Sequence, residues 1–177
     1  GEILSEVSNE NQEEIATILE QTEKLDFLIQ SLVKLSRMES GIIAVHSEDT
    51  TIKQMLESIQ QQFNVKVREK NITLSLCDTD LHIRCDSKWT VEALGNIVDN
   101  AIKYTACGGN VQIKVEQYSF FVKIDIIDDG IGIEKEEIPK IFGRFYRSLS
   151  VADQPGVGIG LFLAREIIQA QKGYIKV

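Results

Sequence analysis

The sequence predicts an α+β fold: a two-layer α/β sandwich with helices on one face of a mixed sheet, preceded by one long dimerisation-type helix. Helix and strand patterns alternate irregularly along the chain, which argues against a doubly wound parallel sheet. Two neighbouring strand patterns are joined by a short polar turn, so part of the sheet is antiparallel. The 177 residues suffice for one full domain and a small appendage.

The long helix is expected over residues 13–40, where apolar residues follow a heptad pattern with an a/d seam. The seam residues are Ile15, Ile18, Leu25, Leu28, Ile29, Leu32 and Leu35. Gly41 suits the left-handed cap that ends such a helix. An isolated helix cannot bury this seam, so it needs a partner. A coiled-coil or four-helix-bundle dimer and packing against its own domain are both open.

The remaining elements follow in order along the chain. Strands are expected at 42–46, 72–76, 82–85, 111–116 and 120–128, with the last two forming a hairpin around 117–119, and another strand begins at 174. Helices are expected at 52–63, 87–105 and 159–172. Ser87 can cap the second of these and Gly173 can close the third. A polar stretch with Gly and Pro covers 148–158.

Composition narrows the range of partners. Acidic residues (27) outnumber Lys and Arg (19), and the net charge of −8 disfavours a nucleic-acid partner. A nucleotide remains possible, because a metal ion and a few local cations can offset its charge. No apolar run approaches the roughly 20 residues that span a bilayer, so we expect a soluble, cytoplasmic piece, compatible with a membrane-anchored parent.

Cysteine and histidine usage bears on redox state and metals. The three cysteines (Cys77, Cys85 and Cys107) contain no CxxC pair and are interpreted as reduced thiols with packing roles. The only two histidines, His46 and His82, have no His or Cys three or four residues away, which argues against a zinc site.

Polar residues line one face of the helix expected at 87–105. Glu92, Asn96, Asn100 and Lys103 share that face, opposite an apolar side. A solvated surface would be served better by Glu or Lys, because Asn costs about 0.6 kcal/mol relative to Ala inside a helix. Carboxamide oxygens suit Mg²⁺, and a lysine one turn further on can meet phosphate. A solvated face and a ligand site are both open.

The second pattern lies where the strand after residue 122 ends. Side chains alternate, so Asp128 continues the apolar row of Ile124 and Ile126 toward the interior, whereas Asp129 faces away. A carboxylate there needs a donor, and the amino group of adenine is one; guanine offers a carbonyl oxygen instead. Gly130 and Gly132 would let a ligand approach the backbone, although an Asp-Gly turn is also common.

Two further patterns follow along the chain. Gly156-Val-Gly-Ile-Gly160-Leu161 leads directly into a helix, where free backbone amides can bind an anion, and a flexible linker is the alternative. Neither the Walker spacing nor the dinucleotide spacing occurs there. In the segment 141–147, Phe142 and Phe145 can anchor a mobile segment or belong to the core, and Arg144 or Arg147 can reach phosphate.

These four patterns, in this order, resemble the catalytic domain of histidine kinases within the gyrase, heat-shock chaperone and mismatch-repair ATPase superfamily. They resemble the family's N box (96–104), first glycine box (128–132), F box (141–147) and second glycine box (156–161), and 32–41 resembles the end of the second dimerisation helix. The resemblance implies ATP and Mg²⁺ as cofactors, with adenine read by Asp128, the nucleoside contacted by Tyr104 and Mg²⁺ bound by Asn100 beside Asn96. It implies a lid from about Arg147 to Gly160 and catalytic roles for Asn100, Lys103 and Arg147. The positions implied to bind the cofactor are Asn96, Asn100, Lys103, Tyr104, Asp128, Gly130, Gly132, Ile133, Gly156, Val157, Gly158, Ile159, Gly160 and Leu161.

The chain departs from the family in its phosphoacceptor region. No His-Glu-x-x-x-Pro occurs; residues 3–10 are similar to the approach to that histidine, with Asn9 in its place. We expect residues 1–40 to be a partial dimerisation region without the phosphoacceptor helix, through truncation rather than natural degeneration. We expect 41–177 to be the catalytic domain, ending before the family's last strand. Pro155 and Val157 stand where the family often has Gly and Thr or Ser.

The resulting expectation is a protein-histidine kinase domain that passes the γ-phosphoryl group of ATP to a histidine on another helix. Its partners would be that phosphoacceptor domain, a response regulator and a second copy in a homodimeric parent. Two alternatives stay open: a non-catalytic nucleotide-sensing or scaffold module, and a gyrase- or chaperone-type ATPase.

Overall fold

The computed structural model describes residues 45–151, 154 and 156–177, together with residues 12, 14–19, 21, 22, 25, 26, 28–30, 32, 33 and 36. The chain divides into two units, Gly1–Ile43 with Ala152–Val157, and Ala44–Val151 with Gly158–Val177. Each unit is described by itself. Among the described residues, no helix combines the length and the apolar character needed to cross a membrane.

In the first unit, every described residue between 12 and 36 is helical, which agrees with the helix expected over 13–40. The apolar seam lies open: Ile18 is 64% exposed, Leu25 58% and Leu32 47%. A helix with this exposed stripe gains stability only when another apolar surface covers it. Leu35, Gly41 and residues 42–44 lie outside the described residues.

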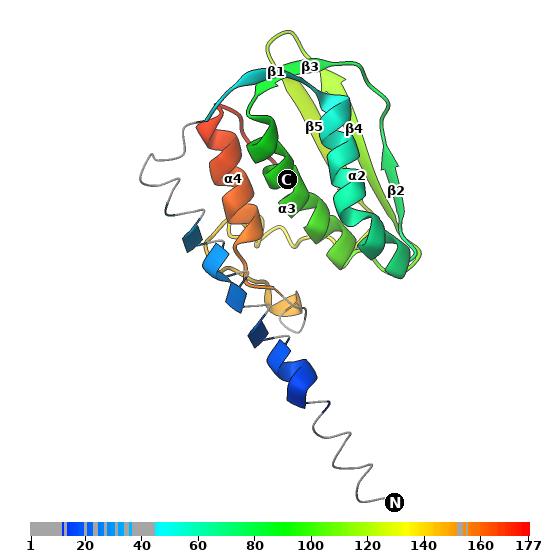
Figure 1. The fold of residues 1–177 in the computed structure, drawn as a ribbon, viewed down its shortest axis with the longest axis vertical. Helices are drawn as coiled ribbons and strands as arrows, with labels where there is room; N and C mark the ends of the chain where they lie inside the picture. The colour runs from blue at the N-terminus through cyan, green and yellow to red at the C-terminus, as the bar shows by residue number, and fades with distance from the viewer. Residues whose placement is uncertain are drawn as a thin grey trace, which may run out of the picture. The chain divides into compact units, whose positions relative to one another are not determined.

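The second unit contains a mixed set of helices and strands, as the sequence predicts (Figure 1). In chain order they are β1 (Glu48–Thr51), α2 (Ile52–Glu69), β2 (Thr73–Leu76), β3 (His82–Cys85), α3 (Ser87–Tyr104), β4 (Asn110–Gln117), β5 (Val122–Asp128), the short 3-10 helix η1 (Leu149–Val151) and α4 (Gly160–Ala170).

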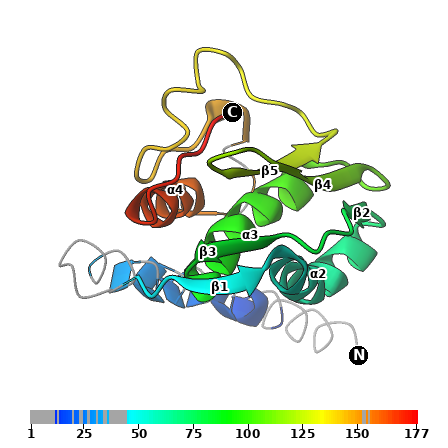
Figure 2. The same cartoon turned by 90° about the horizontal axis from the view of Figure 1, so that it is seen from above.

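The strands form two sheets rather than one. A three-stranded mixed sheet has the order β2-β4-β5, with β2 parallel and β5 antiparallel to β4. A separate antiparallel pair joins β1 to β3. Helices α2 and α3 cover one face of the mixed sheet, and α4 packs beside α3 (Figure 2). The expected layer arrangement is therefore confirmed.

The core lies between the helices and the mixed sheet. Its apolar side chains recur at helical spacing on α2 and α3 and at alternate positions on β4. Its almost fully buried members include Ile52, Ile59, Val98, Ile102, Val111 and Ile113. Each such side chain contributes about 1.5–3 kcal/mol on burial. This packing fixes which face of α3 points away from the core.

Several expected boundaries differ from the structure. Residues Val45–Ser47 have no regular structure, and the first strand forms at β1 instead, because Glu48–Thr51 pairs with β3. Helix α2 continues to Glu69, since Val67 still packs against the core. The turn of the β4–β5 hairpin covers residues 118–121 instead of 117–119, because Tyr118 N–H donates to Phe121 O at 2.9 Å and closes it there. Residues 174–177 form no strand, because no described strand pairs with them.

The caps also differ from expectation. Asp86, not Ser87, caps α3: it has extended dihedral angles, and its Oδ1 accepts the N–H of Trp89 at 3.1 Å. Its Oδ2 accepts the N–H of His46 at 3.0 Å, which attaches the incoming chain to the start of α3. After α4, Lys172 adopts the left-handed conformation (φ 64°), and Gly173 N–H donates to Ile168 O at 2.9 Å.

Candidate functional site

The polar face of α3 points away from the core. Asn96, Asn100 and Lys103 are half-buried, while Val98 and Ile102 on the opposite side are buried in the core. Asn96 Nδ2 donates to Glu92 O at 2.8 Å, which orients the carboxamide along the helix. The structure therefore confirms that these side chains share one face, as their spacing predicts.

The first turn of α4 lies directly against Asn96. A Cβ atom built on Gly160 would be 3.0 Å from Asn96 Oδ1, so a side chain there would require the Asn96 carboxamide to shift. A glycine at this position of the second glycine box therefore favours close packing. It brings the N-terminus of α4, whose backbone N–H groups are unpaired within the helix, next to the polar face of α3.

Lys103 and Tyr104 form a local pair at the end of α3. Lys103 Nζ donates to Tyr104 OH at 3.1 Å and lies 4.8 Å from the centre of the Tyr104 ring. An ammonium group has three donors, so this contact leaves capacity for an anion. Both side chains are half-buried at the rim of the domain.

The end of β5 packs onto this same end of α3. A Cβ atom on Gly130 would lie 2.7 Å from Tyr104 O and 2.7 Å from Asp128 Oδ1. Gly130 N–H also donates to Asp128 Oδ1 at 3.0 Å. Because Gly130 lacks a side chain, the chain can bring Asp128 and Tyr104 together. This contact joins the N box and the first glycine box.

Asp128 lies on the face that the sequence predicts, but it is not buried. It pairs with Val111, a fully buried residue, and paired residues in an antiparallel sheet share a face. The Asp128 side chain is nevertheless exposed, because it stands at the last position of β5, beyond the core. An accessible carboxylate at this place can accept a hydrogen bond from a ligand amino group.

Asp129 has a structural role that the sequence does not reveal. Its two oxygens accept hydrogen bonds from the backbone N–H and the side-chain Nδ2 of Asn110, both at 2.8 Å. These two hydrogen bonds, of which the one from the backbone N–H has the larger effect, hold the pKa of the Asp129 carboxyl below its ordinary value. The pair ties the end of β5 to the start of β4. A polar residue after the Gly108-Gly109 turn is the only signal that could have indicated it.

The segment from 141 to 147 divides into buried and exposed parts. Phe142 is buried, in agreement with a core role, whereas Phe145 is 54% exposed and has φ 59°. Such a conformation is costly for a bulky residue and requires support from its neighbours. Gly158 (φ 74°) packs directly on this stretch of backbone, because a Cβ atom there would lie 2.5 Å from Tyr146 O and 2.8 Å from Phe145 C.

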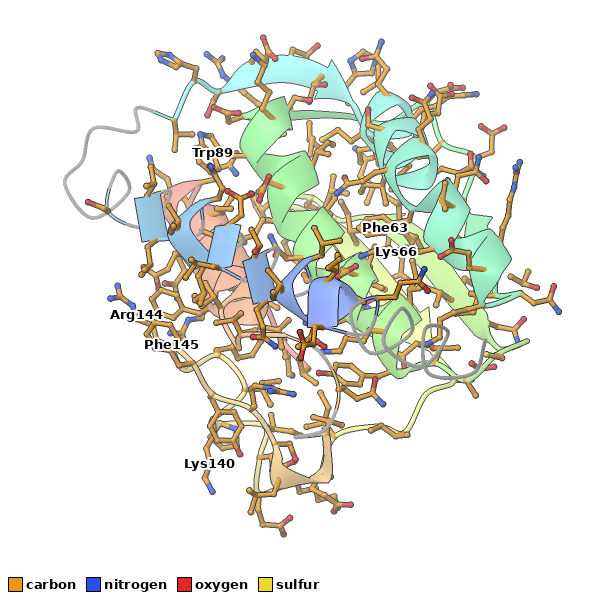
Figure 3. All side chains as sticks on the ribbon, turned by 60° about the horizontal axis from the view of Figure 1, so that its bottom comes forward. Phe63, Lys66, Trp89, Lys140, Arg144 and Phe145 are labelled. Carbon is orange, nitrogen blue, oxygen red and sulfur yellow. The ribbon has the colours of Figure 1, made fainter. Side chains whose placement is uncertain are left out.

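Three polar side chains of this segment make local contacts. Arg144 lies over the Phe162 ring at 4.8 Å, and Figure 3 shows Arg144 next to Phe145. Arg147 Nη2 donates to Val151 O at 2.9 Å, which directs it toward η1. Tyr146 OH donates to Glu137 Oε1 at 3.2 Å. The pKa of Tyr146 is raised, mainly by burial and secondly by this hydrogen bond.

The other predicted positions differ in their surroundings. Gly132 has φ 71° and open space around it, and Ile133 is exposed. Ile159 is buried in the core, so only its backbone can meet a ligand, and Leu161 is half-buried. Gly156 and Val157 belong to the first unit and are not part of this geometry.

The oxygen ligands that these side chains offer fit a hard cation such as Mg²⁺ whose remaining ligands come from a nucleotide. Among the described residues, no three His, Cys, Asp or Glu side chains gather into a metal cluster. The Asn100 carboxamide is a neutral oxygen ligand on the polar face, and Mg²⁺ commonly combines one or two protein oxygens with phosphate oxygens and water.

Comparisons with known proteins show the family to which the chain belongs. The family described as histidine kinase-, DNA gyrase B-, and HSP90-like ATPase matches residues 85–177. The chain is 32% identical over 160 residues to sensor histidine kinase WalK of Bacillus subtilis (88% of this chain, 26% of that protein). It is 28% identical over 153 residues to sensor protein kinase PmrB of Pseudomonas aeruginosa (86% of this chain, 32% of that protein).

Solved structures share the fold. Acinetobacter baumannii histidine kinase AdeS superimposes with a TM-score of 0.77 and 27% identity, over 92% of this chain and 75% of that one. The chain therefore belongs to the histidine kinase-, gyrase- and HSP90-like ATPase family. Within that family it is the ATP-binding catalytic domain of a histidine kinase. It spans about a quarter to a third of the length of the two curated relatives.

Proposed function

We propose that this chain binds ATP with Mg²⁺ and transfers the γ-phosphoryl group to a histidine on a dimerisation helix of its parent kinase. The observation that carries this proposal is the packing of Gly130 on Tyr104, which joins the end of β5 to the end of α3. It brings a carboxylate acceptor, Asp128, to the backbone of Tyr104, whose neighbour Lys103 is a cation. A nucleotide needs both kinds of group, one for the base and one for the phosphates.

In this proposal the residues of α3 and β5 divide the work. Asp128 accepts a hydrogen bond from the adenine amino group, with Gly130, Gly132 and Ile133 along the base. Tyr104 contacts the nucleoside. Asn100, with Asn96 beside it, holds Mg²⁺, which would neutralise charge on the phosphates when bound. Lys103 donates to a phosphate oxygen, which lowers the cost of charge in phosphoryl transfer.

The segment from Arg147 to Gly160 acts as a lid in this proposal, with Arg147 as a catalytic cation. In the structure Arg147 donates to Val151 O, so it would exchange this backbone partner for phosphate when ATP binds. The backbone amides from Gly156 to Leu161 would bind phosphate at the start of α4. A loop of this kind orders on its ligand and excludes water.

The acceptor histidine lies in another helix. His82 sits in β3, where its Nδ1 is 3.2 Å from Asp49 Oδ2, and His46 precedes β1, so neither is on a dimerisation-type helix. We propose that residues 1–40 are part of a dimerisation region, that 41–177 are the catalytic domain, and that the parent is a cytoplasmic-facing homodimer that passes phosphate to a response regulator. The exposed heptad seam supports the homodimer, because it requires an apolar cover.

The binding test is a titration of the chain with ATP and with GTP, each with and without Mg²⁺. We expect tighter binding of ATP than of GTP and a further gain with Mg²⁺. Equal binding of ATP and GTP, or no binding of either, would contradict the nucleotide site.

The transfer test supplies a histidine-bearing dimerisation domain together with labelled ATP. We expect label on that domain's histidine and none on this chain. ATP binding without any transfer would indicate a sensing or scaffold module. Steady hydrolysis without phosphohistidine would indicate a gyrase- or chaperone-type ATPase.

A further inference from the structure

Lys70 binds the end of the helix that carries the proposed site. It is the C-cap residue of α2, and its Nζ donates to three backbone carbonyls: Ile102 O at 2.9 Å, Lys103 O at 2.8 Å and Thr105 O at 2.8 Å. An ammonium group has three N–H donors, so this arrangement uses all of them. The side chain therefore acts as a cap for α3, supplied by a different helix.

The last turn of α3 needs such a cap. The final carbonyls of a helix have no partner within it, and they carry the negative end of the helix dipole. Thr105, which follows the helix, is only 1% exposed, so water is a poor substitute partner there. A buried carbonyl without a donor is costly, and a charged donor is roughly twice as strong as a neutral one.

The capped carbonyls lie within the proposed nucleotide site. One of the three carbonyls bound by Lys70 belongs to Lys103 itself. The other two belong to Ile102, just before the Lys103–Tyr104 pair, and to Thr105, just after it. The carbonyl between them, Tyr104 O, is the group on which Gly130 packs. The same short segment is thus held by Lys70 on one side and by the end of β5 on the other.

From this geometry we propose that Lys70 is a positioning residue for nucleotide binding. It contacts neither the base nor the phosphates in the proposed arrangement. It fixes the last turn of α3, so that Lys103 and Tyr104 keep their places relative to Asp128. This inference rests on the proposed nucleotide site and adds to it a residue outside all four sequence motifs.

The chain offers a matched control in Lys66, one turn earlier on α2. Its Nζ also bridges to α3, through the carboxylate of Asp99, and it lies 5.8 Å from the ring centre of Phe63, next to which Figure 3 shows it. Lys66 therefore joins the same two helices but touches no carbonyl at the end of α3. Lys66→Met removes one helix-to-helix lysine contact and leaves the cap in place.

The test compares Lys70→Met, Lys66→Met, Lys103→Met and the double variant of Lys70 and Lys103 in the full chain. We expect the ATP dissociation constant to rise about tenfold in Lys70→Met and to change less than about twofold in Lys66→Met. We expect the double variant to lose less ATP affinity than the product of the two single losses predicts, because Lys70 acts through Lys103 and Tyr104 and has less left to position once Lys103 is replaced.

A second measurement needs no nucleotide. The Thr105 amide donates to Ala101 O at 3.0 Å, so its hydrogen exchange reports whether the last turn is closed. We expect Lys70→Met to raise that exchange rate at least about tenfold and to shift the Gly130 amide resonance, with no such change in Lys66→Met. If Lys70→Met does not fold, Lys70→Gln, which keeps a neutral donor, is measured in the same two ways.

The outcomes separate this inference from the proposed function. Wild-type ATP affinity in Lys70→Met, or strictly multiplicative effects with Lys103→Met, would overturn the positioning role. If wild-type protein does not bind ATP, or Lys103→Met binds it normally, the nucleotide site itself fails. In that case faster Thr105 exchange would still report the cap alone, without a role in binding.

Discussion

Gly130 packs against the backbone carbonyl of Tyr104, so close that a single added methyl group would lie 2.7 Å from the carbonyl oxygen. This contact joins two segments that lie far apart in the sequence, the end of α3 and the loop after β5. It also leaves Asp128 and the Lys103–Tyr104 pair at one rim of the domain. The proposed nucleotide site depends on this close approach.

Gly130→Ala is therefore expected to damage both the site and the fold. The new Cβ must displace backbone atoms, which costs about 1–3 kcal/mol of unfolding free energy, and we expect at least about tenfold weaker ATP binding. Urea denaturation and ATP titration measure the two effects. Gly95→Ala is the control: its Cβ would meet nothing closer than 3.6 Å, and alanine favours the helix. Normal ATP binding by Gly130→Ala would show that this contact does not shape the site.

Asp128→Asn is expected to reduce the preference for ATP over GTP. The substitution replaces an acceptor-only carboxylate with a group that also donates, so it tolerates the carbonyl oxygen of guanine. Competition titrations with both nucleotides give the ratio of dissociation constants. Asp125→Asn is the control, because Asp125 bonds Lys123 at 2.7 Å and lies on the opposite face of β5. An unchanged ratio in Asp128→Asn would remove Asp128 from base recognition.

Asn100→Asp is expected to weaken binding of Mg²⁺–ATP by altering the ligand set beside the phosphates. The added negative charge faces a polyanion across a half-buried surface, and we expect a loss of about tenfold in affinity. Calorimetric titration with and without Mg²⁺ measures this loss. The exposed Asn64 of α2 provides a control of the same chemistry in Asn64→Asp. Superimposable titrations of Asn100→Asp and the wild type would contradict the assignment.

The Asp129–Asn110 pair predicts a specific acid response. Hydrogen bonds from Asn110 lower the pKa of Asp129 from its ordinary value of 3.8, so the ionised form is favoured in the folded state. The stabilisation is therefore present at pH values above the ordinary pKa of 3.8 and is lost as pH falls through the lower, folded pKa.

An NMR titration of the Asp129 carboxyl measures this pKa directly. Asn110→Ala removes the side-chain donor and keeps the backbone donor, so we expect a partial return of the pKa toward 3.8. A pKa in Asn110→Ala equal to that in the wild type would show that the carboxamide contributes nothing.

Much of the fold and part of the site follow from local patterns. Helical periodicity places Asn96, Asn100 and Lys103 on one side of α3, and the core on the other. Strand alternation gives the direction of Asp128 and Asp129 correctly. These predictions succeed because the spacing of side chains within one element is set by the backbone geometry alone.

Only the tertiary structure shows which residues distant in the sequence pair with one another. The first strand forms at Glu48–Thr51 because β3 offers hydrogen bonds there, and Asp86 replaces Ser87 as the cap because its carboxylate also holds His46. Asp128 is exposed because the core ends before the strand does.

The sequence by itself determined which residues share a face and in which order the four motifs occur. Only the tertiary structure decided that Gly130 meets Tyr104 and that Lys70 caps α3. The physical reason is that the carbonyl groups at a helix end carry no side-chain identity, so no sequence pattern shows which distant group will satisfy them.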